Sequence, residues 1–457
     1  MLGAFEHAWA LLGPRDRELL RRLSVCRGGF RREAATEIAG ATLADLATLI
    51  DRSLLRTDGG GRYGAHPLLL EFARAKAAER PDEATDARDR HARAYLGLLR
   101  RWEEDLAGGD QERALTAVGE EIENVRAAWR HAAEAGDADA LWGACRALQL
   151  YFIQRSGRWD DAAQVFAEAR AALEAAAPSA EAVAGRLRAA EAWFRFRMNE
   201  LDASEALAES ALARLRPHAE AGPPDPVLDR ALASTLNTLG NVAQRRGDAD
   251  AAAARFEEVL ALARARGHEP QVAIASHNLG SVEARRGDYG AAEAHYREAL
   301  AINRRRGNRR SVVRNLVNLG NLALYDGDGE RAERTFAEGL ELARTIRFDG
   351  LMPTLLAHLA EAASARGRPD RALALHGEAL AALSDRAQPA LEAGIRIGRA
   401  DAEAAQGRSA AARGEYLAAL AIAWPLRDLD ATAACLLGLA RLHAAAGDDR
   451  RVADLLD

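Results

Sequence analysis

The chain has 457 residues, enough for two or three domains, and its 62 basic and 68 acidic side chains give a net charge of −6. This balance excludes a bulk electrostatic attraction to nucleic acid. Hydrophobic residues make up 49% of the chain but aromatic residues only 5%, which favours many closely packed helices over a β-sandwich. The N-terminus lacks a signal-peptide pattern, and no apolar run reaches the roughly 18 residues that a membrane helix needs, so we expect no membrane partner.

The only cysteines, Cys26, Cys145 and Cys435, are widely separated in the sequence. This spacing is typical of small core residues in a reducing compartment, so we expect a cytoplasmic protein without a zinc site. The eleven histidines include no His-Glu-x-x-His pair, and no Gly-x-Ser-x-Gly sequence is present. We therefore expect neither a metal site nor a catalytic residue.

Lys76 is the only lysine, which limits the nucleotide chemistry of the chain. A P-loop requires Gly-x-x-x-x-Gly-Lys-Ser/Thr, because the lysine ammonium must reach the β- and γ-phosphates of the nucleotide. Lys76 instead lies between Ala75 and Ala77 in a stretch of helical character. The chain by itself is therefore not a P-loop ATPase, and we do not expect it to be an enzyme.

Residues 1–80 have the element order of a winged helix. Helices are expected over residues 4–12, 14–25, 31–39 and 42–51, and a proline opens the second of them. Residues 53–57 and 62–65 flank a glycine-rich stretch, which predicts a β-hairpin. His66 and Pro67 then open a last helix that runs to about Ala78.

The glycine-rich stretch over residues 59–64 also matches Gly-x-Gly-x-x-Gly, the fingerprint of dinucleotide-binding folds. Such a fold needs a buried parallel strand before the glycines and further βαβ units after them, and nothing strand-like follows in this chain. We interpret the stretch as the turn of the hairpin.

DNA binding is a second possible role of a winged helix. Residues 1–80 have a small excess of basic side chains, 13 against 10 acidic ones. The helix over residues 42–51, which would enter the DNA groove, contains two acids and no Arg, Asn or Gln. Those missing residue types read base edges, and phosphates repel the acids, so DNA binding is the minor alternative.

Residues 81–135 are expected to form a charged helical arm, and residues 136–226 to form degenerate helical repeats. The first degenerate copy has Gly157 at its turn, followed by Ala162 and Phe166, and a weaker copy has Asn199 with Leu212. Prolines between residues 217 and 226 predict a loop without helix over residues 216–226.

Glycine recurs every 40 residues over residues 227–457, at Gly247, Gly287, Gly327, Gly367, Gly407 and Gly447. After the first five of these glycines, alanine follows at five residues, an aromatic residue or histidine at nine, and leucine at thirteen. Glycine ends a helix in a left-handed conformation, and the small residues let two helices approach closely. The pattern resembles tetratricopeptide repeats in a longer variant with extended helices. It predicts an all-α chain in which an N-terminal winged helix with a small β-hairpin precedes an α-α superhelix.

The first helix of each repeat is expected to line the inner wall of the superhelix. Polar side chains on these helices form a candidate groove for a protein partner or a small-molecule inducer: Asn237, Asn241, His277, Asn278, Ser281, Arg314, Asn318 and Asn321. Asparagine can donate and accept hydrogen bonds, as a peptide backbone requires. An equally weighted interpretation is that these side chains cap helices or bond between repeats.

Residues 23–30, 49–55 and 62–66 resemble the winged-helix module of bacterial STAND (NB-ARC-type) proteins, the signal-transduction ATPases with numerous domains. Residues 90–95 and 121–129 resemble the arm that follows this module in the family. With the repeats, the resemblance spans nearly the whole chain. The family order is nucleotide-binding domain, winged helix, arm and repeat sensor, so the resemblance implies an ADP- or ATP-binding domain, in cis or in trans, that this chain lacks.

The sequence Ala65-His66-Pro67 lies where the family has a Met-His-Asp motif, whose histidine contacts the β-phosphate of bound ADP. The resemblance implies this ADP-sensing role for His66. Pro67 replaces the acid of the motif, and the alternative is that His66 only caps the helix that follows it.

The resemblance implies that the chain is the inducer- or partner-sensing portion of a STAND regulator of transcription. Two alternatives are a free-standing repeat scaffold that binds proteins and, less favoured, a winged-helix DNA-binding regulator. Residues 455–457 end the chain early in the second helix of a repeat and without a capping helix, from which we expect a fragment of a longer protein.

Overall fold

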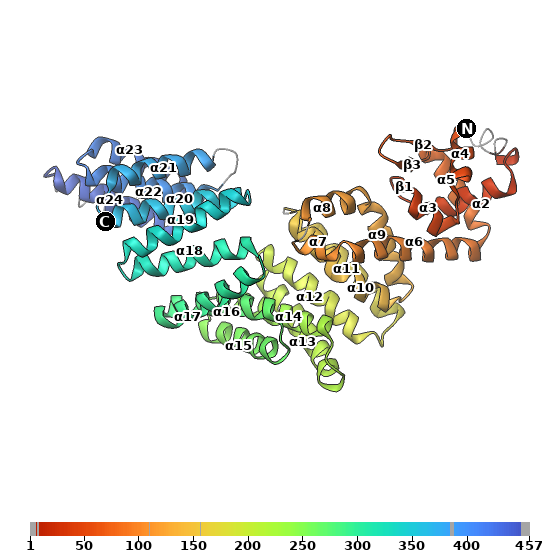
Figure 1. The fold of residues 1–457 in the computed structure, drawn as a ribbon, viewed down its shortest axis with the longest axis horizontal. Coiled ribbons are helices and arrows are strands. Elements are labelled where there is room, and N and C mark those ends of the chain that lie inside the picture. The colour runs from red at the N-terminus through yellow and green to blue at the C-terminus, as the bar shows by residue number, and fades with distance from the viewer. Residues whose placement is uncertain (1–5, 7–8, 109, 156, 384–387, 449–457) are drawn as a thin grey trace. The chain divides into compact units, whose positions relative to one another are not determined.

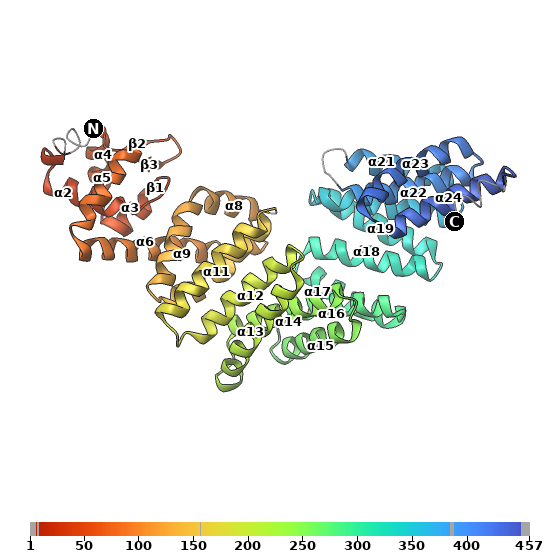
Figure 2. The same cartoon turned by 180° about the vertical axis from the view of Figure 1, so that it is seen from behind.

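The structure is a computed structural model that describes residue 6 and residues 9–108, 110–155, 157–383 and 388–448. It divides into two compact units, residues 1–255 and 256–457. Figures 1 and 2 show the helices of the chain from opposite sides. The expected helix over residues 4–12 lies partly, and the expected end of the chain over residues 455–457 wholly, outside the described residues. Among the described residues, no helix is both long and apolar enough to cross a membrane.

The winged helix is built from four described helices: α2 (Pro14–Leu23), α3 (Arg32–Ala39), α4 (Leu43–Asp51) and α5 (Pro67–Ala78). Their ends follow from local chemistry. Pro14 and Pro67 stand at first helical positions, where no backbone donor is lost. Thr42 and Asp45 form a reciprocal capping box at the start of α4. The predicted helices are confirmed to within two residues.

A small antiparallel sheet joins the helices, in the order β1-β3-β2. The predicted hairpin is confirmed as β2 (Arg56–Thr57) and β3 (Arg62–Gly64). An additional strand, β1 (Phe30–Arg31), pairs with β3 and places Phe30 opposite Tyr63. Sequence patterning missed β1 because two residues are too few to show an alternation of apolar and polar side chains.

The arm begins with the long helix α6, which contacts both the winged helix and the rest of the arm (Figure 1). Helix α6 packs against α2, α3 and α5 of the winged helix, against α9 of the arm and against α10 (Ala138–Gln154), which follows the arm. The arm consists of α6 (Pro81–Arg101), α7 (Glu103–Ala107), α8 (Gln111–Glu120) and α9 (Ile122–Glu134). The single helix α6 therefore connects the winged helix to the rest of the arm.

Two helical pairs and one further helix follow the arm. They are α10 (Ala138–Gln154), α11 (Trp159–Ala176), α12 (Glu181–Arg197), α13 (Leu201–Ala221) and α14 (Pro226–Arg245). The turn residues Gly157 and Asn199 both have positive φ, as the degenerate repeat pattern predicts. The prediction of a loop from residue 216 was wrong, because α13 continues through Pro217 to Ala221. Pro217 lies near the end of the helix, where the loss of one backbone donor affects only the last turn.

The remaining helices form the regular repeats, and their turns lie at the predicted glycines. The helices are α15 (Ala249–Ala265), α16 (Glu269–Arg286), α17 (Tyr289–Arg305), α18 (Arg309–Tyr325), α19 (Gly329–Thr345), α20 (Met352–Ala365), α21 (Pro369–Leu383), α22 (Pro389–Ala405), α23 (Ser409–Leu426) and α24 (Leu429–Ala445), with a 3-10 turn η1 (Asp349–Leu351) before α20. All six glycines of the 40-residue series have φ between 68° and 84°. In the second unit, the successive first helices α18, α20, α22 and α24 contact one another.

A second glycine series lies inside the first helices and sets how closely each helix pair packs. A Cβ atom added to Gly280 would lie 2.8 Å from the Tyr296 ring, and one added to Gly398 would lie 2.6 Å from the His376 ring. At these two positions the ring of a second helix packs directly on the backbone of a first helix. The all-α fold class, with a winged helix before a repeat superhelix, is confirmed.

Candidate functional site

Asn124 of α9 joins the arm to the winged helix through hydrogen bonds. Its side chain is fully buried on a helix face that also carries Val125 and Ala128. The Asn124 Oδ1 atom accepts from the Arg27 backbone amide at 2.6 Å, and the Nδ2 atom donates to the Gly29 carbonyl at 2.8 Å. Arg27 and Gly29 belong to the loop between α2 and β1. The buried Asn124 side chain thus supplies the hydrogen-bond partners that the backbone amide of Arg27 and the carbonyl of Gly29 need.

Glu121, at the start of α9, connects the same network to the hairpin. Only 2% of its side chain is exposed, and its carboxylate forms an ion pair with Arg62 of β3. The Asn124 amide donates to the other carboxylate oxygen at 3.0 Å, and Arg62 also donates to the Gly28 carbonyl at 3.2 Å. Burial raises the pKa of Glu121, and Arg62 and Asn124 oppose that rise. The partners satisfy a charge that would otherwise be costly to bury.

His91 of α6 completes the network, with its Nε2 atom 3.2 Å from the Asn124 Oδ1 atom. That oxygen already accepts from a backbone amide, so the Nε2 atom carries the proton of a neutral ring. Burial lowers the pKa of His91 to about 4, with smaller contributions from His131 and Arg27. Burial also raises the pKa of the nearby Cys26 thiol to about 12. Cys26, Cys145 and Cys435 are all free and buried, as the sequence predicts for core residues.

Two ion pairs fasten α2 to the first turns of α6. Arg21 makes two parallel hydrogen bonds to the Glu83 carboxylate, both of 3.0 Å, and Arg22 contacts Asp86 at 2.6 Å. Both arginines are more than four-fifths buried. Fork-shaped contacts of this kind constrain orientation as well as distance. The sequence did not predict this junction, and its one available signal was Asn124 itself, an asparagine on an otherwise apolar helix face.

His66 lies at the surface as the N-cap of α5. Its Nδ1 atom accepts a hydrogen bond from the Leu68 backbone amide at 3.3 Å. This contact matches the capping role that was the alternative for His66, and the ring is exposed. The ADP-sensing role of His66 stays a prediction.

The predicted groove residues are divided between the two units and serve several structural roles. Asn237 and Asn241 lie on α14 in the first unit, and Asn237 donates to the Ala233 carbonyl of its own helix at 2.9 Å. His277, Asn278 and Ser281 lie on α16, and Arg314, Asn318 and Asn321 lie on α18 in the second unit. Asn278, Ser281, Asn318 and Asn321 are half-buried, and Arg314 is exposed.

The contact between His277 and Asn315 links two neighbouring repeats, with the His277 Nδ1 atom 2.7 Å from the Asn315 Oδ1 atom. Asn315 is buried and was not among the predicted groove residues. Burial lowers the pKa of His277, and Arg314 adds to that effect. His277 therefore follows the inter-repeat bonding interpretation.

Helix α4 is the one that would enter the DNA groove, and its residue Asp45 bonds within the winged helix. Asp45 caps α4 and forms an ion pair with Arg15 at 3.2 Å, and Leu43 is 61% exposed. An acid and an exposed leucine at this position present the wrong chemistry to a phosphate backbone.

Comparison with known families and structures supports both the winged helix and the repeats. A winged helix-turn-helix family model matches residues 12–80, and tetratricopeptide repeat models match residues 231–305 and 355–390. Comparison with curated proteins gave no significant match.

Two solved structures with similar folds cover most of this chain. One is a STAND protein with a tetratricopeptide repeat sensor from Pyrococcus horikoshii, with a TM-score of 0.54 and 15% identity over 94% of this chain and 67% of its own. The other is aspartyl phosphate phosphatase F from Bacillus subtilis, with a TM-score of 0.50 and 11% identity over 80% of this chain and 92% of its own. The chain therefore contains a winged helix-turn-helix domain and tetratricopeptide repeats, in a fold similar to that of a STAND protein with a repeat sensor.

Proposed function

We propose that this chain is the sensor portion of a cytoplasmic STAND-type regulator. The repeats bind an inducer or a protein partner, and the arm transmits that event to the winged helix. The winged helix in turn controls a nucleotide-binding domain that this chain does not contain. Binding would favour the state in which the winged helix is released from the ADP-bound domain, since a ligand shifts an equilibrium only toward the state that it binds better.

The observation that carries the proposal is the junction between the winged helix and the arm. Helix α6 packs against both parts, and Asn124 bonds to the loop of the winged helix while Glu121 pairs with the hairpin. Separation of the two parts would replace each of these hydrogen bonds by one to water, at a net cost of about 0.5–1.5 kcal/mol each. The junction therefore favours joint movement of the arm and the winged helix.

The exposure of His66 supports the proposal that the winged helix controls a separate nucleotide-binding domain. The side chain lies at the surface of the winged helix, where it is accessible to a separate domain. Its capping contact uses only the Nδ1 atom, which leaves the Nε2 atom able to donate to a phosphate oxygen.

The first test is the size of the native protein, measured by immunoblot of the source cells with an antibody against the repeats. A band well above 49.1 kDa is expected, because the nucleotide-binding domain would then belong to the same chain. The purified native protein should also retain ADP, and a His66→Ala variant should lose it faster than the wild type. A band at 49.1 kDa, together with no ATPase bound in trans, would favour the scaffold function instead.

A further inference from the structure

A cavity of about 630 Å³ lies between the winged helix and the arm, and Arg27 and His91 belong both to its lining and to the Asn124 network. The end of α5, the start of α6 and the face of α9 form its walls. Five arginines line it and only two acids do: Arg27, Arg74, Arg88, Arg126 and Arg130 against Glu123 and Glu134. Its volume lies within the range of small-molecule sites.

Arg74 is held in place by backbone carbonyls rather than by an acid. Its Nε atom donates to the Ser24 carbonyl at 2.8 Å and its Nη2 atom to the Cys26 carbonyl at 3.3 Å. Within the described residues it forms no ion pair. Burial lowers the pKa of Arg74, and the neighbouring Arg27 adds to this effect by repulsion. Glu71 opposes this lowering only in part, and three of the five N–H donors of Arg74 are left for another partner.

Three further arginines around the cavity also have no acidic partner in the described part of the chain: Arg27, Arg88 and Arg130. Arg88 bonds only to the Ala84 carbonyl and the Thr85 hydroxyl. Arg126 differs, because it pairs with Asp161. The positive potential also reaches the buried His91, whose pKa Arg27 helps to lower. The cavity thus concentrates positive charge in a chain whose net charge is −6.

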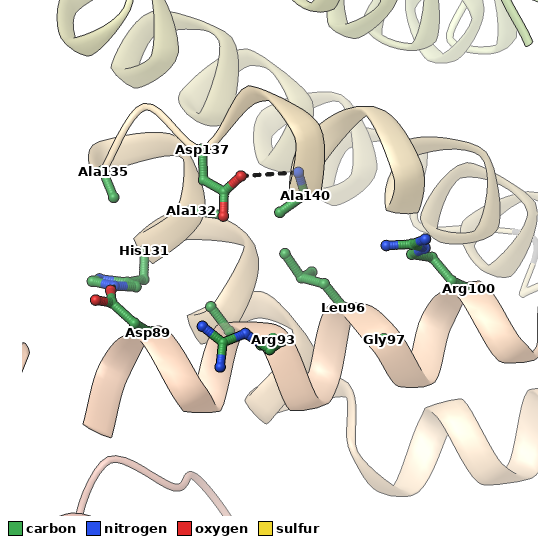
Figure 3. Close-up of a pocket in the computed structure, with 11 residues that line it drawn as sticks. Asp89, Arg93, Leu96, Gly97, Arg100, His131, Ala132, Ala135, Asp137 and Ala140 are labelled. Atoms are coloured by element: carbon green, nitrogen blue, oxygen red, sulfur yellow. Dashed lines mark hydrogen bonds and ion pairs between the residues drawn. The ribbon is translucent and has the colours of Figure 1, made fainter. Parts of the chain in front are cut away.

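A neighbouring cavity shows that an excess of arginines over acids is not a general property of cavities in the arm. That cavity, of about 330 Å³, lies between α6, α9 and α10 (Figure 3). Its cations Arg93 and Arg100 are matched by Asp89 and Asp137, and Asp89 contacts His131 at 2.7 Å. The two cavities share His131 and α6 but differ in charge.

We propose that the larger cavity binds a small anion that carries at least two linked phosphate groups. Guanidinium groups bind phosphate oxygens through paired N–H donors, and five arginines line one cavity here. A ligand in this place would contact Arg27 and Arg74 of the winged helix together with Arg88 and Arg130 of the arm. It would therefore hold the two parts together and strengthen the junction that transmits the sensor signal.

The test is calorimetric titration of the whole chain with sodium pyrophosphate at 0.15 M salt. Saturable binding with one site per chain is expected. The double variant Arg27→Gln/Arg130→Gln should weaken it at least tenfold, since neither side chain has a structural ion pair. Arg93→Gln is the control, because it removes one positive charge from the other cavity, and the single variants Arg27→Gln and Arg130→Gln match it in charge. Thermal unfolding of each variant should show an unchanged midpoint without ligand.

Several results would overturn the proposal. These are no binding of pyrophosphate, equal binding by the double variant and the wild type, or an equal loss in Arg93→Gln. Tighter binding of a short polyglutamate peptide than of pyrophosphate would also overturn it, because the site would then recognise an acidic protein segment. The outcome does not depend on the native size of the protein, so it is separate from the test of the proposed function.

Discussion

Asn124 and Arg27 are 97 positions apart in the sequence, yet the Asn124 Oδ1 atom accepts the Arg27 backbone amide at 2.6 Å. The same side chain contacts Gly29, His91 and Glu121. One amide group therefore serves a loop of the winged helix, the long helix α6 and the start of α9. No substitution can keep all four contacts, because only an amide of this length supplies both the acceptor and the donors.

Replacement of Asn124 by leucine is expected to destabilise the chain by roughly 2–4 kcal/mol, because several buried polar groups would lose their partners. Urea unfolding measures this change. The matched control is Gln164→Leu, at an exposed position of α11 where the amide bonds only to Glu168. An equal effect of the two substitutions would show that the Asn124 network does not stabilise the junction.

The glycines inside the first helices are expected to be intolerant of alanine where a ring packs on them. Gly280→Ala should destabilise the chain by about 1–3 kcal/mol, since its Cβ would lie 2.8 Å from the Tyr296 ring. Gly414→Ala on the exposed face of α23 has open space and should instead gain up to about 1 kcal/mol from helix propensity. Thermal unfolding of the pair measures the contrast. A gain in both variants would mean that the helices separate easily at Gly280.

The stability of the chain should fall as the pH falls from about 6.5 to about 4. The folded protein holds the pKa of His91 at about 4, below the ordinary value of 6.5, so the unfolded chain takes up a proton first. For His91 alone the loss between pH 7 and pH 5 is about 2 kcal/mol, and the loss is complete below pH 4. Urea unfolding at both pH values should show a smaller loss for His91→Gln than for the wild type. Burial also lowers the pKa of His376 to about 4, so His376 adds to the loss of stability at low pH. The His91→Gln variant leaves that contribution unchanged.

The inner helices of the repeats are expected to carry the binding of the partner or inducer. The double variant Asn278→Ala/Asn318→Ala should retain severalfold less partner than the wild type when the tagged chain is purified from its source cells. Its thermal unfolding midpoint should stay the same, because both side chains are only half-buried. Gln164→Ala, outside these helices, is the control. Full retention of the partner by the double variant would remove Asn278 and Asn318 from the groove.

Much of the fold was predictable from the sequence, because its elements are specified locally. Glycines such as Gly287 and Gly327 end helices through a backbone conformation that needs no distant partner. The 40-residue spacing then implies stacking, since a single helix pair cannot bury its own apolar face. The hairpin turn before Arg62 was likewise visible as a local signal.

Only the tertiary structure decided the features that depend on contacts between distant segments. The pairing of β1 with β3, the role of Asn124 and the meeting of Arg27, Arg74 and Arg130 around one cavity leave no periodic trace in the sequence. Local rules were also overridden at Pro217, where α13 continues despite the missing backbone donor. The sequence by itself determined the helices, their turns and the order of the parts, because these depend on near neighbours. The junction and its charge depend on which side chains the packing of α6 brings together, and that is a property of the tertiary structure alone.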